Sequence, residues 1–397
     1  MVIPQLRFKE FSKSWKKNML SDIAEINPSV GPLPDKFTYI DLESVKKGRL
    51  LIEKSVELKD APSRAQRLLE KDDVLFQMVR PYQQNNYYFN LDGNYVASTG
   101  YAQIRAKLCS KFLYYILHEE VFLGEVMNRC TGTSYPAINS KDFSSIEVYT
   151  PSLEEQTKIS SFLSAIDTKV DQLTQEHELI SEYKKGMVEQ LFSQKLRFKA
   201  DNGADFKDWK NKSILDIAYV FIGLVTTMTT SYRENGTPLI RNSDIKKNKI
   251  LKDQLIYLDP KFADIHENRK LRTNDIVTVH TGEVGISSII PTELEGAIGF
   301  ATINTRVFNE QANPDYLVCY FNSHEFISWC ISVSTGDGRQ NLNLKDFNAA
   351  IIPTPCLEEQ TKIANFLSAI DQKIDNVAAQ IDQAKVWKKG LLQQMFV

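Results

Sequence analysis

Two stretches of the chain, residues 151–194 and 354–397, place apolar side chains at every seventh position. An apolar seam with a seven-residue period over five repeats is typical of a coiled-coil helix, not of a strand. About 40 residues at roughly 1.5 Å per residue predict a helix about 60 Å long for each stretch. The predicted seam residues are Ile159, Ile166, Leu173, Ile180 and Met187 in the first stretch, and Ile363, Ile370, Val377, Ala384 and Leu391 in the second.

The two stretches are copies of one another. PSLEEQTKISSFLSAID, from Pro151, returns as PCLEEQTKIANFLSAID from Pro355, and about half of the aligned positions are identical. The sequence therefore contains an internal duplication. Because each helix has an apolar stripe that needs cover, we expect the two helices to pack on each other as an antiparallel coiled coil. The alternative is that each helix packs on its own globular region.

Local signals mark the start and the middle of each predicted helix. Ser152, with Glu155 three positions later, is a capping box for the first helix. The second copy has a cysteine at the corresponding position, so we expect Thr354 to begin that helix instead. Gly186 and Gly390 occupy the same place in the two copies. Glycine costs about 1 kcal/mol relative to alanine inside a helix, so either a close helix or partner contact or simple inheritance through the duplication explains both.

The repeat extends beyond the helices. Residues 4–24 and 195–218 share LRFK, a tryptophan and the tripeptide DIA, so an opening segment precedes each globular region. The order of opener, globular region and long helix occurs twice. An antiparallel helix pair would bring the end of the second helix near the start of the chain, which predicts a cyclic arrangement with a pseudo-two-fold axis.

Each globular region is predicted to be rich in strands and to contain one late amphipathic helix. The late helices span residues 111–127, capped by Ser110, and 315–332, opened by Asn313 and Pro314. The predicted strands are Phe37–Leu42, Val74–Val79, Tyr87–Phe89 and Ala102–Arg105 in the first region, and Leu255–Leu258, Ile276–Val279, Ile286–Ile290 and Thr305–Phe308 in the second.

These patterns define the fold class and the domains. We expect an α+β protein with two strand-rich domains, joined by two long helices that form an antiparallel coiled coil. The segments are residues 1–150 for the first domain, 151–194 for the first helix, 195–353 for the second domain with its opener at 195–218, and 354–397 for the second helix.

Composition is that of an ordinary folded protein. The chain has 397 residues, 42% hydrophobic and 25% charged, with a formal net charge of −2. No apolar run approaches the roughly 18 residues of a membrane span, and the N-terminal sequence does not resemble a signal peptide. The five cysteines form no CxxC pair, so we expect buried thiols in a reducing cytoplasm. The near-neutral charge is not the strongly basic footprint of a protein that holds nucleic acid alone.

Catalytic motifs are missing from the sequence. We find no glycine-rich cofactor turn, no Asn/Asp-Pro-Pro-aromatic tetrapeptide and no GxxxxGK[ST] loop. The five histidines lack metal-ligand spacing, so no metal site is expected. The paired glutamates at 154–155 and 358–359 sit in the first turn of each helix, where acids are favourable for structural reasons. An enzyme is therefore possible but is not supported by these residues.

Polar and aromatic clusters do recur in both globular regions. In the major groove of DNA, arginine pairs with guanine, and asparagine or glutamine with adenine. The alternative for each cluster is a solvated loop. The candidate DNA contacts are Arg80, Tyr82, Gln83, Gln84, Asn85, Ser134 and Tyr135 in the first region, and Arg241, Asn242, His280, Arg339, Gln340 and Asn341 in the second. One pair of clusters lies at matching positions, 133–135 and 337–339.

The duplicated P-x-L-E-E-Q-x-K-I box, each copy closing a variable region and opening a long helix, resembles the specificity subunits of Type I restriction–modification systems. The resemblance covers the whole chain. In that family each variable region is a target-recognition domain that reads one half of a bipartite DNA sequence, and the paired helices set the spacing. The resemblance implies that the unlike globular regions read an asymmetric target.

The resemblance also implies that this chain is not itself catalytic, but is one subunit of a methyltransferase and restriction endonuclease complex with several partners. Double-stranded DNA, two modification subunits that carry S-adenosylmethionine, and restriction subunits that use ATP and magnesium would assemble with this chain, which itself would hold no cofactor. The helical segments would dock the partners. A coiled-coil scaffold with two protein-binding lobes is the alternative, favoured by the slightly acidic second half, and a single-chain methyltransferase or nuclease is a third possibility.

Overall fold

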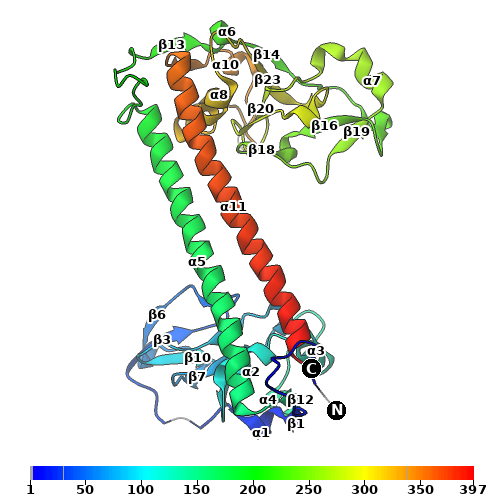
Figure 1. Ribbon diagram of the computed structural model, residues 1–397. Coiled ribbons are helices and arrows are strands. Elements are labelled where there is room, and N and C mark those ends of the chain that lie inside the picture. Colours follow the sequence, from blue (N-terminus) through cyan, green and yellow to red (C-terminus); the bar gives the residue numbers. More distant parts are fainter. Residues whose placement is uncertain (1–2, 30, 337) are drawn as a thin grey trace. The chain divides into compact units, whose positions relative to one another are not determined.

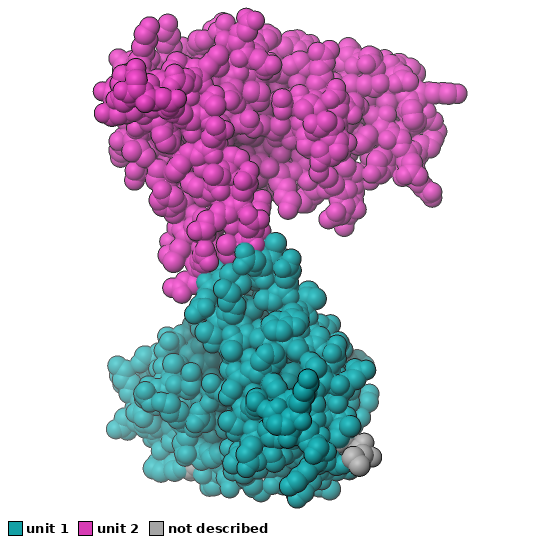
Figure 2. Space-filling view, viewed as in Figure 1, with its two compact units in different colours: residues 1–174, 378–397 teal, residues 175–377 magenta. Residues whose placement is uncertain are grey.

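A computed structural model describes residues 3–29, 31–336 and 338–397 (Figure 1). The chain divides into two compact units, each of which contains one globular region and a part of both long helices (Figure 2). Unit 1 comprises Met1–Thr174 with Ala378–Val397, and unit 2 comprises Gln175–Val377. Both strand-rich regions and both long helices confirm the α+β fold predicted from the sequence.

The long helices α5 (Leu153–Phe192) and α11 (Leu357–Met395) run antiparallel within each unit. In unit 1 the start of α5 lies beside the end of α11, where Lys388 pairs with Asp167. In unit 2 the end of α5 lies beside the start of α11, where Lys184 pairs with Asp371. The two ion pairs are equivalent in the duplicated sequence. Lys388 lies 204 residues after Lys184, and Asp371 lies 204 residues after Asp167.

The predicted seam faces inward in both units. Its buried members are Ile159, Ile166, Leu173, Ile363, Val377 and Leu391, and its half-buried members are Ile180, Met187, Ile370 and Ala384. In unit 1 the buried face of α5 also packs against Val74 and Phe112 of the globular region. The two packing alternatives are therefore combined, since the same stripe covers the partner helix and the domain.

The globular region of unit 1 is built from two four-stranded sheets and two strand pairs. The sheet orders are β2-β11-β8-β9 and β6-β3-β10-β7, and the pairs are β1-β12 and β4-β5. The central strand β8 is buried along its whole length, as its continuous apolar run requires. The strands are β1 (Lys16–Met19), β2 (Ala24–Ile26), β3 (Lys36–Ile40), β4 (Val45–Lys46), β5 (Arg49–Leu50), β6 (Lys54–Glu57), β7 (Ala65–Leu68), β8 (Val74–Gln77), β9 (Tyr87–Tyr88), β10 (Tyr95–Ser98), β11 (Tyr101–Ala106) and β12 (Glu147–Thr150).

Unit 2 repeats this arrangement except at the edges of its second sheet, where β7 has no equivalent strand beside β22 and β15 is added beside β19. Its sheets are β14-β23-β20-β21 and β15-β19-β16-β22, and its pairs are β13-β24 and β17-β18. The strands are β13 (Lys210–Ser213), β14 (Ala218–Ile222), β15 (Tyr232–Arg233), β16 (Thr237–Arg241), β17 (Ile245–Lys246), β18 (Lys249–Ile250), β19 (Ile256–Leu258), β20 (Ile276–Val279), β21 (Ser287–Ile289), β22 (Ile298–Phe300), β23 (Thr302–Val307) and β24 (Ile351–Thr354). Every strand predicted from the sequence overlaps one of these strands.

The predicted late helix of each region is broken into two helices, so this expectation was wrong. Glu119 and Ser323 interrupt the apolar pattern and accept hydrogen bonds from the backbone two to three residues later, which starts a new helix. Ser110 is the first helical residue and not the cap. The short helices are α1 (Leu20–Ile23), α2 (Ser110–Ile116), α3 (Glu120–Asn128), α4 (Ser140–Ser144), α6 (Ile214–Ile217), α7 (Pro260–Ile265), α8 (Pro314–Phe321), α9 (His324–Val333) and α10 (Leu344–Phe347).

Two expectations about the long helices also change. Thr354 does not begin α11, because it ends strand β24 and the helix starts at Leu357. Gly186 and Gly390 have room for a Cβ, with no described atom within 4 Å, so a close helix–helix contact does not explain them. The Ser152 hydroxyl does accept a hydrogen bond from the Glu155 backbone, at 3.4 Å, but the Glu155 side chain is engaged elsewhere.

The contacts of the Glu155 side chain explain why both copies of the repeat carry the sequence LEEQ at the start of the long helix. The carboxylate of Glu155 is buried and accepts two hydrogen bonds from Arg7, both at 2.7 Å, and one from Trp15 at 3.3 Å. These bonds raise the pKa of Arg7. The side chain of Gln156 turns back to the carbonyl oxygen of Pro151 at 3.0 Å. The box therefore fixes the opening segment onto the first turn of α5.

Unit 2 has the same arrangement at the start of α11. We call each buried glutamate, with the arginine and tryptophan that donate hydrogen bonds to it, a lock. Glu359 accepts bonds from Arg197, at 3.1 and 2.9 Å, and from Trp209 at 3.0 Å. The hydrogen bond to Glu359 raises the pKa of Arg197. The openers also contact the ends of the helices in equivalent ways. Leu6 donates its backbone N–H to Gln394 at 2.8 Å, and Leu196 donates to Gln190 at 3.1 Å. The predicted cyclic repeat is present in these matched contacts.

Candidate nucleic-acid interface

Two loops meet at one edge of the globular region in unit 1. The first is residues 78–86, after strand β8, and the second is residues 131–137, between α3 and α4. Val79 and Ala137 form an isolated antiparallel bridge, and the Arg80 N–H donates to the Pro136 carbonyl at 2.7 Å. We call these two segments the recognition loops of unit 1. Their backbones are joined, so side chains from both loops share one surface.

Arg80 and Tyr135 come together across the recognition loops. The Arg80 guanidinium lies over the Tyr135 ring, 4.1 Å from its centroid, and Tyr135 is 63% exposed. A cation stacked on an aromatic face is held in place without losing its hydrogen-bond donors. Arg80 adopts a left-handed backbone conformation with φ of 54°. The turn beneath Tyr135 requires glycine, since Gly132 has φ of 89° and an added Cβ would lie 3.1 Å from the Tyr135 carbonyl oxygen.

The other polar candidates in unit 1 divide into displayed and structural groups. Tyr82 is 51% exposed and Ser134 is also exposed. The Gln83 side chain is bound at 2.9 Å by the amide of buried Gln77, and the Asn85 side chain accepts a hydrogen bond from the Lys47 backbone at 3.1 Å. Gln84 is half-buried with φ of 51°. The exposed surface of these loops therefore centres on Tyr82, Ser134 and Tyr135, and the half-buried Arg80 presents its guanidinium on the Tyr135 ring.

Unit 2 has recognition loops at the same place, residues 279–285 and 335–341. Thr281 and Asn341 form the matching bridge, and the Gly282 N–H donates to the Gln340 carbonyl at 2.9 Å. Gly336 supports this turn as Gly132 does in unit 1, with φ of 114° and an added Cβ only 2.5 Å from the Arg339 carbonyl oxygen. Asp337, which the sequence comparison paired with Thr133, lies outside the described residues.

Three of the six predicted residues in unit 2 hold these loops together. Asn242 accepts the His280 N–H at 3.0 Å and donates to the Ala301 carbonyl at 3.2 Å. The side chain of Asn341 accepts a bond from Thr281 at 3.0 Å. Burial lowers the pKa of His280. These side chains are partners of one another and of the backbone, so their role here is to shape the loops.

Arg241 is also engaged within unit 2. Its guanidinium binds both carboxylate oxygens of Asp244, at 2.9 and 2.7 Å, which raises the pKa of Arg241. Arg339, in contrast, is exposed and its side chain makes no hydrogen bond or ion pair to another described residue. Gln340 beside it is half-buried. Arg339 is therefore the cation that the unit 2 recognition loops display.

The two sets of recognition loops present different chemistry on one backbone plan. The backbone contacts align Arg80 with Gly282 and Tyr135 with Arg339. Each unit thus displays one arginine, but on opposite loops. Such a difference on a shared frame is expected where specificity resides in loops held by a rigid scaffold.

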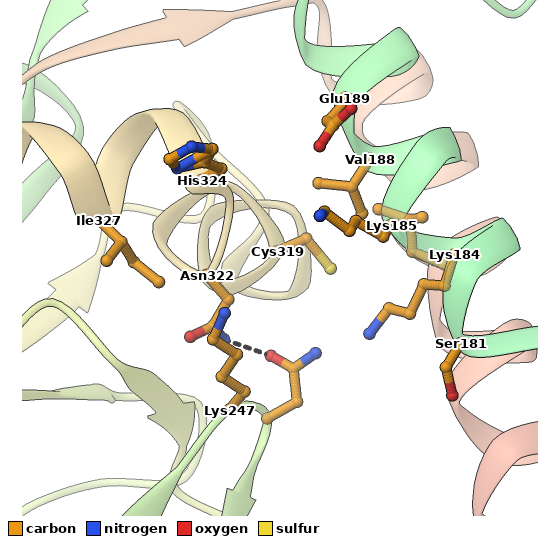
Figure 3. A pocket seen from close by; sticks show the side chains of 12 residues that line it. Ser181, Lys184, Lys185, Val188, Glu189, Lys247, Cys319, Asn322, His324 and Ile327 are labelled. Atoms are coloured by element: carbon orange, nitrogen blue, oxygen red, sulfur yellow. Dashed lines mark hydrogen bonds between the residues drawn. The ribbon is translucent and has the colours of Figure 1, made fainter. Parts of the chain in front are cut away.

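A cavity of 460 Å³ in unit 2 is lined by residues of α5, α8, α9, α11 and the turn between β17 and β18 (Figure 3). Lys184 and Lys185 reach it from α5, and Lys247 reaches it from the turn between β17 and β18. Asn322 and Asn248 are joined by a hydrogen bond of 2.7 Å at its wall. Burial raises the pKa of the Cys319 thiol, which lines the cavity, to about 12, so this thiol stays protonated at neutral pH.

The described ranges contain no group of three or more His, Cys, Asp or Glu residues placed to hold a metal ion. No described helix is both long and apolar enough to cross a bilayer. All five cysteines are free, but only Cys319 and Cys330 are buried and Cys356 is exposed, so the expectation of five buried thiols was wrong.

Another pair of matching loops was not predicted from the sequence. They are the turns between β4 and β5 and between β17 and β18, which carry VKKGRL and IKKNKI. Their signal was present as a short repeat offset by 200 residues, instead of the 204 residues that separate the helices. The change of offset reflects insertions and deletions between the two globular regions.

Comparison with known proteins agrees with this architecture. The profile of the family described as "Type I restriction modification DNA specificity domain" matches residues 12–182 and again 206–386. The chain is 24% identical over 293 residues, 71% of its length, to the MjaVIII specificity subunit of Methanocaldococcus jannaschii, and 25% identical over 162 residues, 41% of its length, to the EcoBI specificity subunit of Escherichia coli. The aligned regions cover 68% and 34% of these relatives.

Two solved structures have the same fold. The Type I restriction–modification S subunit from M. genitalium aligns with a TM-score of 0.61 at 16% identity, covering 100% of this chain and 99% of that one. A chain from a structural study of complex assembly in the type I R-M system aligns with a TM-score of 0.57 at 22% identity, covering 96% and 97%. With two profile matches that together span most of its length, the chain belongs to the family of Type I restriction–modification specificity proteins.

Proposed function

We propose that this chain reads DNA sequence for a Type I restriction–modification complex, and that each unit reads one half of a two-part, asymmetric target. One observation carries the proposal. Both units present a pair of bridged recognition loops on the same frame, but Arg80 with Tyr135 is displayed in unit 1 and Arg339 in unit 2. Loops with equivalent backbones and different side chains at their exposed ends are suited to reading two different half-sites of DNA.

The displayed groups have the chemistry of base readers. Arginine donates two parallel hydrogen bonds to O6 and N7 of guanine in the major groove. Stacking on Tyr135 orients Arg80 before DNA arrives, so less side-chain freedom is lost on binding. The loop-shaping residues, including Asn242 and His280, then act indirectly by fixing where Arg339 and Gln340 lie.

The remaining functions would belong to partner subunits. In this proposal two modification subunits carry S-adenosylmethionine, restriction subunits carry ATP and magnesium, and this chain holds none of these cofactors. The complex would act in the cytoplasm. The modification subunits would also supply positive charge around the DNA, which is consistent with a net charge of only −2 on this chain.

The test is to express the chain with its modification subunit and to map methylated adenines across a genome. A gapped, two-part motif is expected. Exchanging the turn at residues 131–137 for an unrelated sequence should alter one half of that motif only. Random methylation with an active partner would contradict the proposal. Binding of S-adenosylmethionine by the purified chain alone would favour a single-chain methyltransferase instead.

A further inference from the structure

Positive charge is repeated in both units at two turns, residues 46–49 and 246–249, which we call the basic turns. In unit 1 Lys46 lies opposite Arg49 in the antiparallel backbone register of the β4–β5 hairpin. In unit 2 Lys246 lies opposite Lys249 in the β17–β18 hairpin. Three cations therefore occupy each four-residue turn. All six are exposed: Lys46, Lys47 and Arg49 in unit 1, and Lys246, Lys247 and Lys249 in unit 2.

Few of these charges have an acidic partner. Arg49 pairs with Asp171 on α5, and Lys246 lies 3.6 Å from Glu283. Within the described residues no ion pair involves the other four side chains, which are those of Lys46, Lys47, Lys247 and Lys249. A pair of uncompensated lysines at the same turn in both halves of an otherwise slightly acidic chain points to an anionic ligand that meets both units.

Each basic turn is held rigidly. In unit 1 the Lys47 N–H donates to Asn85 at 3.1 Å, and Gly48, with φ of 77°, packs so tightly that an added Cβ would lie 2.6 Å from the Tyr114 hydroxyl. In unit 2 the Asn248 side chain donates to Asp371 at 3.1 Å and accepts from Asn322 at 2.7 Å. Anchoring reduces the ordering cost that a mobile lysine loop would incur on binding.

The basic turns adjoin the recognition loops. Asn85, which fixes the first turn, belongs to the loop that displays Arg80. Glu283, beside Lys246, follows Gly282 of the unit 2 recognition loop. Backbone-binding cations next to base-reading side chains are the arrangement that DNA readers need, since phosphate contacts set the register in which bases are read.

We propose that the two basic turns bind the phosphate backbone of the DNA, one turn at each half of the target, and so position the recognition loops without reading sequence themselves. The inference rests on the proposed function of the chain. It assigns the turns to affinity and register, and the recognition loops to specificity.

The two turns differ in their surroundings. In unit 2 the cavity beside the turn adds Lys184 and Lys185, although Lys184 also pairs with Asp371. In unit 1 the position equivalent to Lys185 is Lys389, and it is neutralised by Glu120 at 3.0 Å. His324 replaces that glutamate in unit 2. Glu189 also lines this cavity, so an acidic side chain lies beside the added lysines in unit 2 as one does beside Lys389 in unit 1.

The test uses the full chain assembled with its modification subunit. Binding to a duplex that carries the mapped target, and to a duplex of scrambled sequence, is measured by fluorescence anisotropy over a series of salt concentrations. One variant carries Lys46→Gln with Lys47→Gln, and another carries Lys247→Gln with Lys249→Gln. A matched control carries Lys59→Gln with Lys261→Gln, which removes two exposed lysines that lie outside both turns.

Each phosphate contact contributes about 0.9 to the slope of log affinity against log salt. Each turn variant should therefore lower the slope by about 1 to 2, and should weaken binding to the target and the scrambled duplex by similar factors. The control should leave the slope unchanged. Retained methylation of the same motif at high enzyme concentration, with unchanged thermal unfolding, would show that folding and sequence reading are intact.

Three results would overturn the inference. One is a slope that the turn variants do not change, or change no more than the control does. Another is weakened binding on the target duplex alone, which would make the turns base readers. The last is loss of the modification subunit from the complex without DNA, which would make the turns a protein-docking surface. Wild-type complex that methylates no two-part motif would contradict the proposed function itself.

Discussion

Unit 1 and unit 2 are most alike where they are buried and least alike where they are displayed. The Arg7–Glu155 lock of unit 1 reappears as Arg197–Glu359 in unit 2 with the same donors and acceptors. Both pairs of sheets and both helix ion pairs also recur. At the recognition loops, however, the two units share only the backbone contacts.

This difference indicates which positions of a duplicated protein can change in sequence and which cannot. A buried carboxylate that receives three hydrogen bonds cannot change alone without leaving an unpaired charge. A side chain at the tip of a loop, in contrast, can change without altering the fold, because the glycine-supported turn beneath it carries the constraint. The frame therefore keeps its chemistry in both copies, while the tips are free to diverge.

The largest expected effect tests whether the two locks are equivalent. Arg7→Ala and Arg197→Ala each leave a glutamate that is almost fully buried without its ion-pair partner, which costs about 3–5 kcal/mol. Hydrogen exchange should show local unfolding of residues 4–24 in the first variant and of 195–218 in the second. A loss below about 1 kcal/mol in one variant only would break the equivalence. Replacing Arg7 and Glu155 together by methionine is the control, and it should cost less.

The second prediction concerns acid, and it separates the units. The pKa of His118 in unit 1 is lowered from 6.5 to about 4, mainly by burial; the hydrogen bond to the Tyr114 carbonyl opposes this shift, the nearby Lys388 adds to it and Asp167 opposes it. The unfolded chain then binds more protons than the folded chain between these values. The resulting stability is complete above about pH 6.5 and is lost as the pH falls towards 4, by about 1.4 kcal/mol per pH unit.

Unit 2 has Asn322 at the position of His118, so it lacks this contribution. Urea unfolding of the wild type and of His118→Asn at pH 7 and pH 5 measures the effect. The variant should lose less stability on acidification than the wild type does. Identical acid sensitivity in both proteins would show that His118 is not responsible.

The third prediction concerns the displayed arginines. Arg80→Ala and Arg339→Ala should each cost roughly 1–3 kcal/mol of discrimination if each contacts a guanine. The first should relax one half of the methylated motif, and the second should relax the other half. Tyr135→Leu keeps the Arg80 charge but removes its stacking partner, so a smaller loss in the same half is expected. Methylation mapping of each variant is the measurement, and an unchanged motif would remove that residue from the interface.

The smallest effect is expected at the two helix ion pairs. Asp167→Asn and Asp371→Asn each break a pair whose side chains are 22–34% exposed. Partly solvated pairs contribute at most about 1 kcal/mol. The two variants should therefore melt within a few degrees of the wild type and of each other. A much larger loss in one would show that the helix pair is not equally supported in the two units.

The sequence predicted the frame well because the frame is periodic. The heptad seam located both long helices, and the eight strands predicted from the sequence each overlap a strand of the structure, although the remaining strands were not predicted. The break between α2 and α3 was missed because Glu119 was not recognised as a helix cap inside an apolar pattern. For the same reason the cap of α9 at Ser323 was overlooked.

The interface was harder to predict because its polar residues serve two purposes. Arg80 and Arg241 look alike in sequence, but Arg241 is bound by Asp244 only three residues away and Arg80 stacks on Tyr135 from another loop. Tertiary contacts decide which residue of the chain binds a given polar side chain, and the sequence pattern alone does not reveal them. The basic turns were missed for a different reason, since their repeat is short and offset from the longer one.

The packing beneath the basic turn of unit 1, which we call the seat of the turn, also limits which sequence exchanges between the two halves the protein can tolerate. Gly48 fits there because the Tyr114 hydroxyl fills the space that a Cβ would need. In unit 2 the corresponding residues are Asn248 and Val318. Exchanging Gly48 for asparagine alone would create a clash, whereas exchanging the turn together with the helix residue beneath it would not. Genetic exchange between such halves should therefore succeed in blocks that include a turn and its seat, and fail as single substitutions.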